Sequence, residues 1–351
     1  LKSSLSAQAP LCRARCCILA MGSMICPGGP GPAGECLSWL PSLRRVQDVK
    51  DEDVKDANGA LPLPRKKPKG VSVHFLVEEF PVEVLTVFPQ FNFNETTFEE
   101  LGAWIWGSYN DRQKAGGPVN VVDLFGHRTM RKGGASLCDA IGRKSPGSVG
   151  DATIFVSWAW KYRVKDFVYA LYAYCMRQKV DPKSVFCWIC FFNNNQHVWL
   201  QPGGVSNAVE IFESNVRMVG TVAVVLDTLD ASRSTYFSRL WTIFEVYIAI
   251  LNKLKITIAP MEAVTDATIE LWFRTEAHDD QSHALAKSLR ELMTIDMKAA
   301  RASNPEDAAS IRRQVEQLGG SQPMYQTMTD AVVKAFVTSF GYGYLVEDGY
   351  L

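Results

Sequence analysis

Short apolar runs alternate with helix-spaced apolar positions through the middle of the chain. Four runs are apolar along nearly their whole length and are predicted strands: residues 152–157, 185–192, 221–226 and 255–258. Three stretches between them place apolar side chains three or four positions apart, which predicts helices: residues 164–178, 205–219 and 236–254. Strands without polar alternation are covered on both faces, as in parallel sheets. The alternation predicts an α/β domain with a doubly wound parallel sheet at residues 148–300.

The flanking regions have weaker patterns. Residues 1–70 combine Pro/Gly-rich and charge-rich stretches, which predicts a disordered tail. Residues 71–147 form a lead-in region that ends in a Gly-rich loop, with two strand-like pieces and one short helix: residues 71–77, 82–88 and 97–106. Residues 301–351 are predicted to form C-terminal helices at 305–318 and 324–336, and a fifth edge strand is expected at residues 292–295.

Composition excludes several classes of function. The 351 residues include 37 Lys and Arg against 37 Asp and Glu. A net charge of zero creates no field that attracts nucleic acid or an anionic membrane, so neither is an expected partner. The chain has no run of 18 or more apolar residues, so no membrane-spanning helix is predicted.

Cysteine usage indicates a reducing compartment. Nine cysteines are unevenly placed, with five of them in the first 36 residues, which is unlike a disulfide framework. The apolar run at residues 16–26 follows Arg13 and Arg15, as in a signal peptide, but it is short and lacks a small-residue cleavage pattern. We therefore expect a cytoplasmic protein.

Potential metal ligands have simpler interpretations. Cys187 and Cys190 form a Cys-x-x-Cys, but residues three apart in a strand point to opposite faces and cannot share one ion. His197 follows three asparagines and is expected in a polar loop. One further group has ligand-type side chains at uneven spacing and is interpreted as a solvated turn before a helix: His278, Asp279, Asp280 and His283. No metal site is predicted.

The third predicted helix contains a single charged residue. Residues 240–251 read LWTIFEVYIAIL, and Glu245 is the only ionisable acid or base among them apart from a tyrosine. A helix that is apolar on nearly every side is covered on nearly every side, so the carboxyl of Glu245 is expected to be buried. A buried carboxyl has a partner or a function, and an ion pair or a loop contact is the simpler of the two. Trp241 lies one turn earlier on the same face.

Several motifs occur in the order found in Toll/interleukin-1 receptor (TIR) domains. Residues 238–245, SRLWTIFE, resemble the Ser-x-x-Trp-Cys-x-x-Glu pattern, and residues 155–157, FVS, resemble the end of the first TIR strand. The chain is most similar to a TIR-like group of algae and protists, through motifs at residues 155–160, 188, 195–197, 239–245, 295–296 and 305–307. This resemblance covers roughly half of the chain and implies a flavodoxin-like strand order.

The TIR superfamily contains NAD-cleaving enzymes and modules that only self-associate or recruit partners. The resemblance implies that Glu245 would be the catalytic carboxylate, stabilising an oxocarbenium-like ribose as neutral nicotinamide leaves. Ligands of this fold lie beyond the carboxyl ends of the first and third strands. The residues implied to bind NAD are therefore Ser157, Trp158, Trp160, Lys161 and Trp241, with Asp227, Thr228 and Asp230 on the opposite side of the crevice. NAD would be a substrate, and no cofactor is expected.

Three positions depart from the protist group. Trp158 replaces a histidine, Cys190 an aspartate and Thr242 a cysteine. The second hypothesis is therefore a non-catalytic module that associates with itself or with other signalling proteins. A deep pocket containing Glu245 would favour the enzyme, and a packed-over Glu245 would favour the module.

Overall fold

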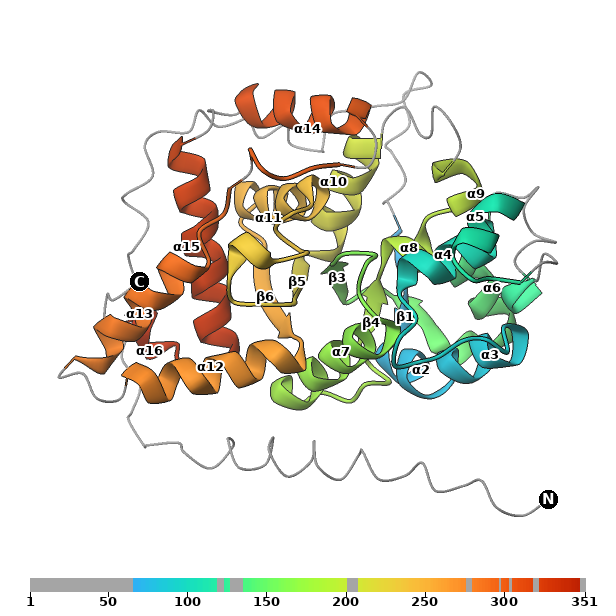
Figure 1. Cartoon of the computed structure of the whole chain (residues 1–351), viewed down its shortest axis with the longest axis horizontal. Coiled ribbons are helices and arrows are strands. Elements are labelled where there is room, and N and C mark those ends of the chain that lie inside the picture. The colour runs from blue at the N-terminus through green and yellow to red at the C-terminus, as the bar shows by residue number, and fades with distance from the viewer. Residues whose placement is uncertain are drawn as a thin grey trace, which may run out of the picture. The chain divides into compact units, whose positions relative to one another are not determined.

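The structure is a computed structural model that describes residues 66–118, 123–126, 135–200, 208–275, 280–296, 298–302, 305–317 and 322–347. These residues belong to one compact unit, Val54–Leu351. A mixed six-stranded sheet runs through this unit, surrounded by helices (Figure 1). Every residue of β3 and all but the first of β5 are buried, which shows that the centre of the sheet is covered on both faces.

The strand order combines a parallel group with an antiparallel pair. From one edge to the other the strands are β2 (Val149–Asp151), β1 (Lys69–Ser72), β4 (Phe186–Trp188), β3 (Ile154–Ser157), β5 (Thr221–Leu226) and β6 (Lys255–Pro260). The last four are parallel neighbours, whereas β1 pairs antiparallel with both β4 and β2. All four strands predicted from apolar runs are present. The prediction of a wholly parallel sheet was wrong, because β1 runs antiparallel to both of its neighbours, β4 and β2.

The crossover helices follow the predicted pattern. The three that link the parallel strands are α7 (Val164–Gln178), α10 (Ala208–Val219) and α11 (Leu240–Leu251). Residues 205–207 of the second predicted helix lie outside the described part of the chain. The two helices α10 and α11 pack together and against β3 and β5, and α7 packs on β5 and β6. Two short helices, α8 (Cys190–Asn193) and α9 (Gln196–Trp199), lie between β4 and α10.

The lead-in region is helical where strands were predicted. After β1 the chain forms α2 (Val73–Glu78) and α3 (Phe80–Val87). The Ser72 hydroxyl accepts a hydrogen bond from the Phe75 amide and so caps α2, while Pro81 occupies the first turn of α3, where its missing N–H has no cost. These local signals outweigh the β-branched and aromatic composition that favoured strands.

Capping boxes begin three further helices of this region. They start α4 (Phe98–Trp106), α5 (Tyr109–Lys114) and α6 (Leu137–Lys144). The first confirms the predicted helix at residues 97–106, and the third stands where a loop was predicted. In α6, Ser136 and Asp139 exchange side-chain and backbone hydrogen bonds. A 3₁₀ turn, Pro146–Ser148, then leads into β2.

The C-terminal part packs helices beside β6. They are α12 (Glu262–Thr275), α13 (Gln281–Leu292), α14 (Pro305–Gln317), α15 (Gln322–Ser339) and α16 (Tyr344–Glu347). Both predicted C-terminal helices are present as α14 and α15. The expected fifth strand at residues 292–295 is absent, because α13 extends to Leu292 and the Ile295 amide donates to the Thr329 hydroxyl on α15. None of the helices that the structure describes has the length and apolar character needed to cross a bilayer.

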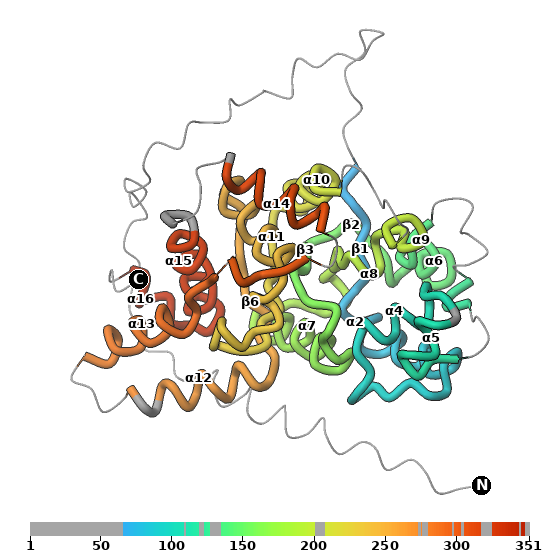
Figure 2. The backbone as a smooth tube through the Cα atoms, turned by 45° about the horizontal axis from the view of Figure 1, so that its top comes forward, coloured from blue at the N-terminus to red at the C-terminus, as the bar shows by residue number. Residues whose placement is uncertain are grey.

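The predicted lead-in region is not separated from the sheet. The strand β1 takes Lys69 and Gly70 from the predicted tail and Val71 and Ser72 from the lead-in region, and it lies between β2 and β4. The backbone tube in Figure 2 shows it running beside β2. Just before it, the Pro68 carbonyl accepts from the Ala152 amide, and Lys69 forms an ion pair with Asp151 at 2.8 Å. Of the predicted tail, residues 1–65 lie outside the described part of the chain.

Candidate functional site

Glu245 lies in the second turn of α11, where the helix packs on β3 and β5. Nearly all other residues of this helix are apolar and buried, and only 6% of Glu245 is exposed, as its position in the helix predicts. Burial raises the pKa of this carboxyl to about 8, and the hydrogen bond that Ser157 would donate to the ionised form opposes that rise. The carboxyl is therefore largely neutral at pH 7. Its Oε2 atom has no hydrogen-bond partner among the described residues.

Ser157 connects Glu245 to a buried tyrosine. It ends β3, is fully buried, and places its hydroxyl 2.5 Å from the Tyr236 hydroxyl. The Tyr236 hydroxyl in turn donates to the Thr242 carbonyl at 3.2 Å. Because Tyr236 has only one proton, this arrangement leaves Ser157 to donate to Tyr236. A neutral Glu245 can then donate to Ser157, so that each hydroxyl in the chain donates once.

Aromatic side chains and a thiol fill the space at the carboxyl ends of β3 and β4. The Trp160 indole donates to Sγ of Cys190 at 3.4 Å. Burial, with a smaller contribution from the neighbouring Glu245 charge, raises the pKa of the Cys190 thiol to about 12. Trp158 is buried against the rings of Phe98 and Phe167, with centroids 4.7 and 4.5 Å away. Its Nε1 atom lies near the same Cys190 thiol but makes no hydrogen bond of normal geometry in the described part of the chain.

The polar residues that follow β5 are used within their own loop. Asp227 accepts from the Ser234 hydroxyl at 2.6 Å and from the Thr235 amide at 2.7 Å. Asp230 accepts from the Ser232 amide and hydroxyl, which starts a 3₁₀ turn at Ala231–Arg233. Both carboxylates therefore accept hydrogen bonds from residues of the loop that follows β5 and stabilise the conformation of that loop.

The structure brings together four of the six predicted site residues. Glu245, Ser157 and Trp158 are buried, Trp160 is partly buried, and the four are linked through Cys190 and Tyr236. Lys161 is exposed in the turn that follows.

Trp241 turns toward different neighbours. Its indole donates to Asp307 on α14 at 3.1 Å, and its ring packs on Phe212 of α10 with centroids 5.2 Å apart. Although it shares a helix face with Glu245, the helices around it hold its side chain in a separate set of contacts.

Two residues of the buried group had no role in the sequence prediction. Tyr236 looked like the start of a helix, and nothing in its spacing indicates a hydrogen bond to Ser157, 79 positions away. Cys190 was considered only as part of the Cys-x-x-Cys and as a departure from the protist group. It begins α8 rather than continuing the strand of Cys187, so the predicted strand at residues 185–192 was too long.

The described residues contain no group of three or more His, Cys, Asp or Glu side chains arranged to hold a metal ion. Of the histidine and aspartate group near α13, His278 and Asp279 lie outside the described residues. Asp280 caps α13 by accepting from the amide of His283 at 3.0 Å.

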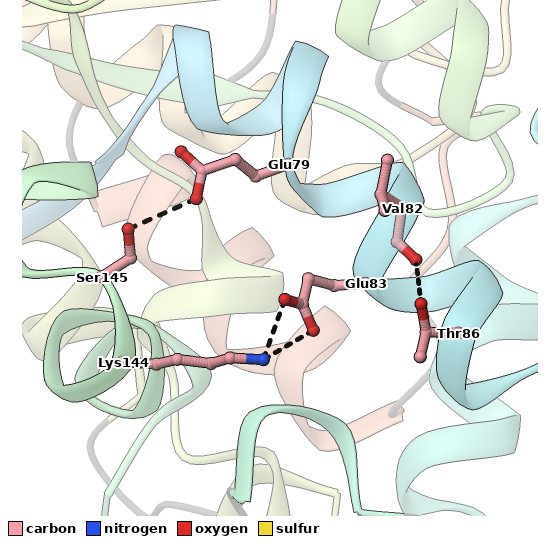
Figure 3. Close-up of polar contacts among 6 residues, drawn as sticks. All are labelled: Glu79, Val82, Glu83, Thr86, Lys144 and Ser145. Carbon is pink, nitrogen blue, oxygen red and sulfur yellow. Dashed lines mark hydrogen bonds and ion pairs between the residues drawn. The ribbon is translucent and has the colours of Figure 1, made fainter.

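Two cavities lie in the lead-in region, away from Glu245. One, of about 130 Å³, is lined by Phe75, Glu79, Glu83, Phe125, Ile141, Lys144 and Ser145. Figure 3 shows its polar side, where Lys144 contacts both oxygens of Glu83 at 2.8 Å and the Ser145 hydroxyl donates to Glu79. The other, of about 300 Å³, is lined by Val77, Pro81, Val82, Leu85, Phe91 and Phe93. Neither cavity includes a residue of the Glu245 group.

Comparisons with protein-family models, curated proteins and solved structures found no match for this chain. The resemblance to TIR domains therefore rests on the motifs of the sequence alone.

Proposed function

We propose that this chain is a TIR-like signalling module that acts by binding protein, copies of itself first, and that Glu245 serves a structural role. The observation that carries this proposal is the packed-over carboxyl of Glu245, which is 6% exposed and has a pKa of about 8. Stabilising a cationic ribose requires a negative carboxylate that the ribose can reach. A covered and neutral carboxyl supplies neither the charge nor the access.

The strand order supports the TIR-like, flavodoxin-like assignment. Numbered along the chain from β3, the four parallel strands lie in the order 2-1-3-4, which is the beginning of the flavodoxin-like order 2-1-3-4-5. The proposal is also supported by Ser157, which ends the first of these strands, and by Glu245, which lies in the helix after the third. Three of the four described cysteines are buried free thiols, which favours the proposed cytoplasmic location.

The test of this proposal combines an activity and an association measurement on the full chain. Incubation with NAD at high protein concentration, followed by chromatography for nicotinamide, should show no turnover. Sedimentation velocity over the same concentrations should show self-association. Nicotinamide release that disappears in Glu245→Gln would overturn the non-catalytic assignment, and a chain that stays monomeric would overturn the self-association.

NAD cleavage is the second candidate, favoured by two unpaired polar atoms. Oε2 of Glu245 and Nε1 of Trp158 are a buried acceptor and a buried donor without partners among the described residues. Such orphaned atoms require an explanation, and an absent ligand is one. This hypothesis requires the side chains packed over Glu245 to move and expose its carboxyl. In that case Glu245→Gln should reduce turnover by about 10²–10³, as for loss of one preorganised charged group.

A further inference from the structure

Two of the most exposed apolar side chains of the described residues are neighbours on α3. Val82 is 63% and Leu85 is 52% exposed, and positions three apart lie side by side on a helix. They border the cavity of about 300 Å³, whose remaining walls are Val77, Pro81, Phe91 and Phe93. We call this surface the α3 groove. The α3 groove thus consists of two exposed apolar side chains and an adjoining cavity with apolar walls.

The walls of the α3 groove are held by contacts with the rest of the domain. Phe91 and Phe93 meet edge to face at 6.5 Å, and Phe93 meets Tyr169 of α7 in the same way at 5.8 Å. The α2 helix, which supplies Val77, packs on α7 (Figure 1). The groove is thus formed before any partner binds, which reduces the entropy cost of association.

The rim of the α3 groove carries charges of both signs. Glu78 follows Val77 in the chain. Burial raises the pKa of the Tyr169 hydroxyl, and the nearby charge of Glu78 raises it further. Lys165 precedes Tyr169 by one turn of α7, and its amide donates to the Phe93 carbonyl. Glu95 and Arg163 form an exposed ion pair at 3.7 Å nearby.

We infer that the α3 groove is a self-association surface and that its occupant is the same groove of a second copy of this chain. A two-fold interface uses one patch twice, so the patch must be self-complementary. Here Val82 and Leu85 of one copy can fill the hollow of the other. A strongly acidic or strongly basic partner would meet like charges on part of the rim, whereas an identical rim offers both signs. The inference rests on the proposed function.

The net charge of the chain agrees with this occupant. With 37 basic and 37 acidic residues, two copies approach without overall electrostatic repulsion. The apolar centre and charged rim also match the anatomy of protein interfaces.

The test replaces the two exposed apolar residues with charges. Val82→Glu/Leu85→Glu in the full chain should raise the dissociation constant of the dimer at least about 100-fold in sedimentation velocity, because like carboxylates would be buried against apolar walls. Val180→Glu is the matched control, since Val180 is also an exposed valine, 37% accessible, and lies beyond the C-terminal end of α7. It should associate as the parent does.

Thermal melting of each variant controls for folding, and Leu85→Gln provides a milder change if the double variant melts early. Leu85→Gln should weaken the dimer by an intermediate amount. A parent that dimerises together with groove variants that dimerise equally well would overturn the α3 groove while leaving the binding module intact. A parent that stays monomeric at every concentration would instead remove the self-association on which the inference rests.

Discussion

At the scale of single residues, the protonation of Glu245 determines what its surroundings can do. The chain of hydroxyls from Ser157 through Tyr236 to the Thr242 carbonyl is complete when Glu245 donates a proton to it. An ionised Glu245 would instead have to accept from Ser157, and Tyr236 would then lose one of its two contacts. A neutral carboxyl in this position is the first donor of a buried hydrogen-bond network, and this network connects α11 to β3.

The pH dependence of stability tests this protonation state. The pKa of Glu245 is raised from its usual range to about 8 in the folded protein. The unfolded chain therefore loses this proton first, and the contribution to stability, full at acidic pH, declines from about pH 4.5 to pH 8. Glutamine cannot titrate, but its amide can replace the donor.

We therefore expect Glu245→Gln to fold and to gain stability relative to the parent by a few kcal/mol between pH 5 and pH 8. Urea unfolding of both proteins at pH 5, 6.5 and 8 measures the difference. A parent that becomes more stable than the variant as pH rises would show that Glu245 is ionised in the fold.

At the scale of elements, the most informative strand is β1, which joins the end of the predicted tail to the lead-in region and yet lies inside the sheet. A Cβ at Gly70 would come within 2.8 Å of the Cys187 carbonyl carbon and oxygen in β4. Glycine is thus required there because two strand backbones approach closely. Such a position reports directly on whether β1 and β4 are neighbours.

Substitution at Gly70 tests this neighbour relation. Gly70→Ala should destabilise the protein by about 1–3 kcal/mol, because the added methyl overpacks the β1–β4 contact. Gly147→Ala is the matched control, since a Cβ at Gly147 meets nothing within 4 Å. Chemical denaturation of the two variants gives the comparison, and equal stability would place β1 outside the sheet.

The central strands give a second prediction at this scale. Phe155 and Trp188 lie opposite each other on β3 and β4, stacked with centroids 4.5 Å apart, and both also pack on Phe212 of α10. Truncating either ring to alanine should cost about 3–5 kcal/mol. Tyr169→Ala, which removes a partly exposed ring, serves as the comparison and should cost much less. Similar losses for all three in denaturant titrations would contradict the core position of Phe155 and Trp188.

At the scale of the whole molecule, the described residues from Lys66 onward contain the full sheet and its helices. From their composition we predict that residues 1–65 do not stabilise the fold. A chain shortened to begin at Lys66, which keeps Pro68 and Lys69 in contact with Ala152 and Asp151, should melt within a degree or two of the parent. A drop of several degrees in a calorimetric scan would show that the removed residues stabilise the fold.

The sequence by itself determined the parallel strands, the three crossover helices and the burial of Glu245. Continuous apolar runs and helical spacing are local patterns, and a lone acid in an apolar helix is buried whichever partners surround it. Capping was equally local, yet it competed with strand-like composition at α2 and α3 and with a Gly-rich loop pattern at α6, so these three helices were missed.

Only the tertiary structure decided what surrounds Glu245. Whether its carboxyl meets a crevice or a packed wall depends on Trp158, Cys190 and Tyr236, which come from three separate segments of the chain. Trp241 turns away because α14, more than 60 residues later, supplies Asp307 as its partner. Helical spacing specifies which side chains share a face, but the neighbours of that face are set by how distant elements pack.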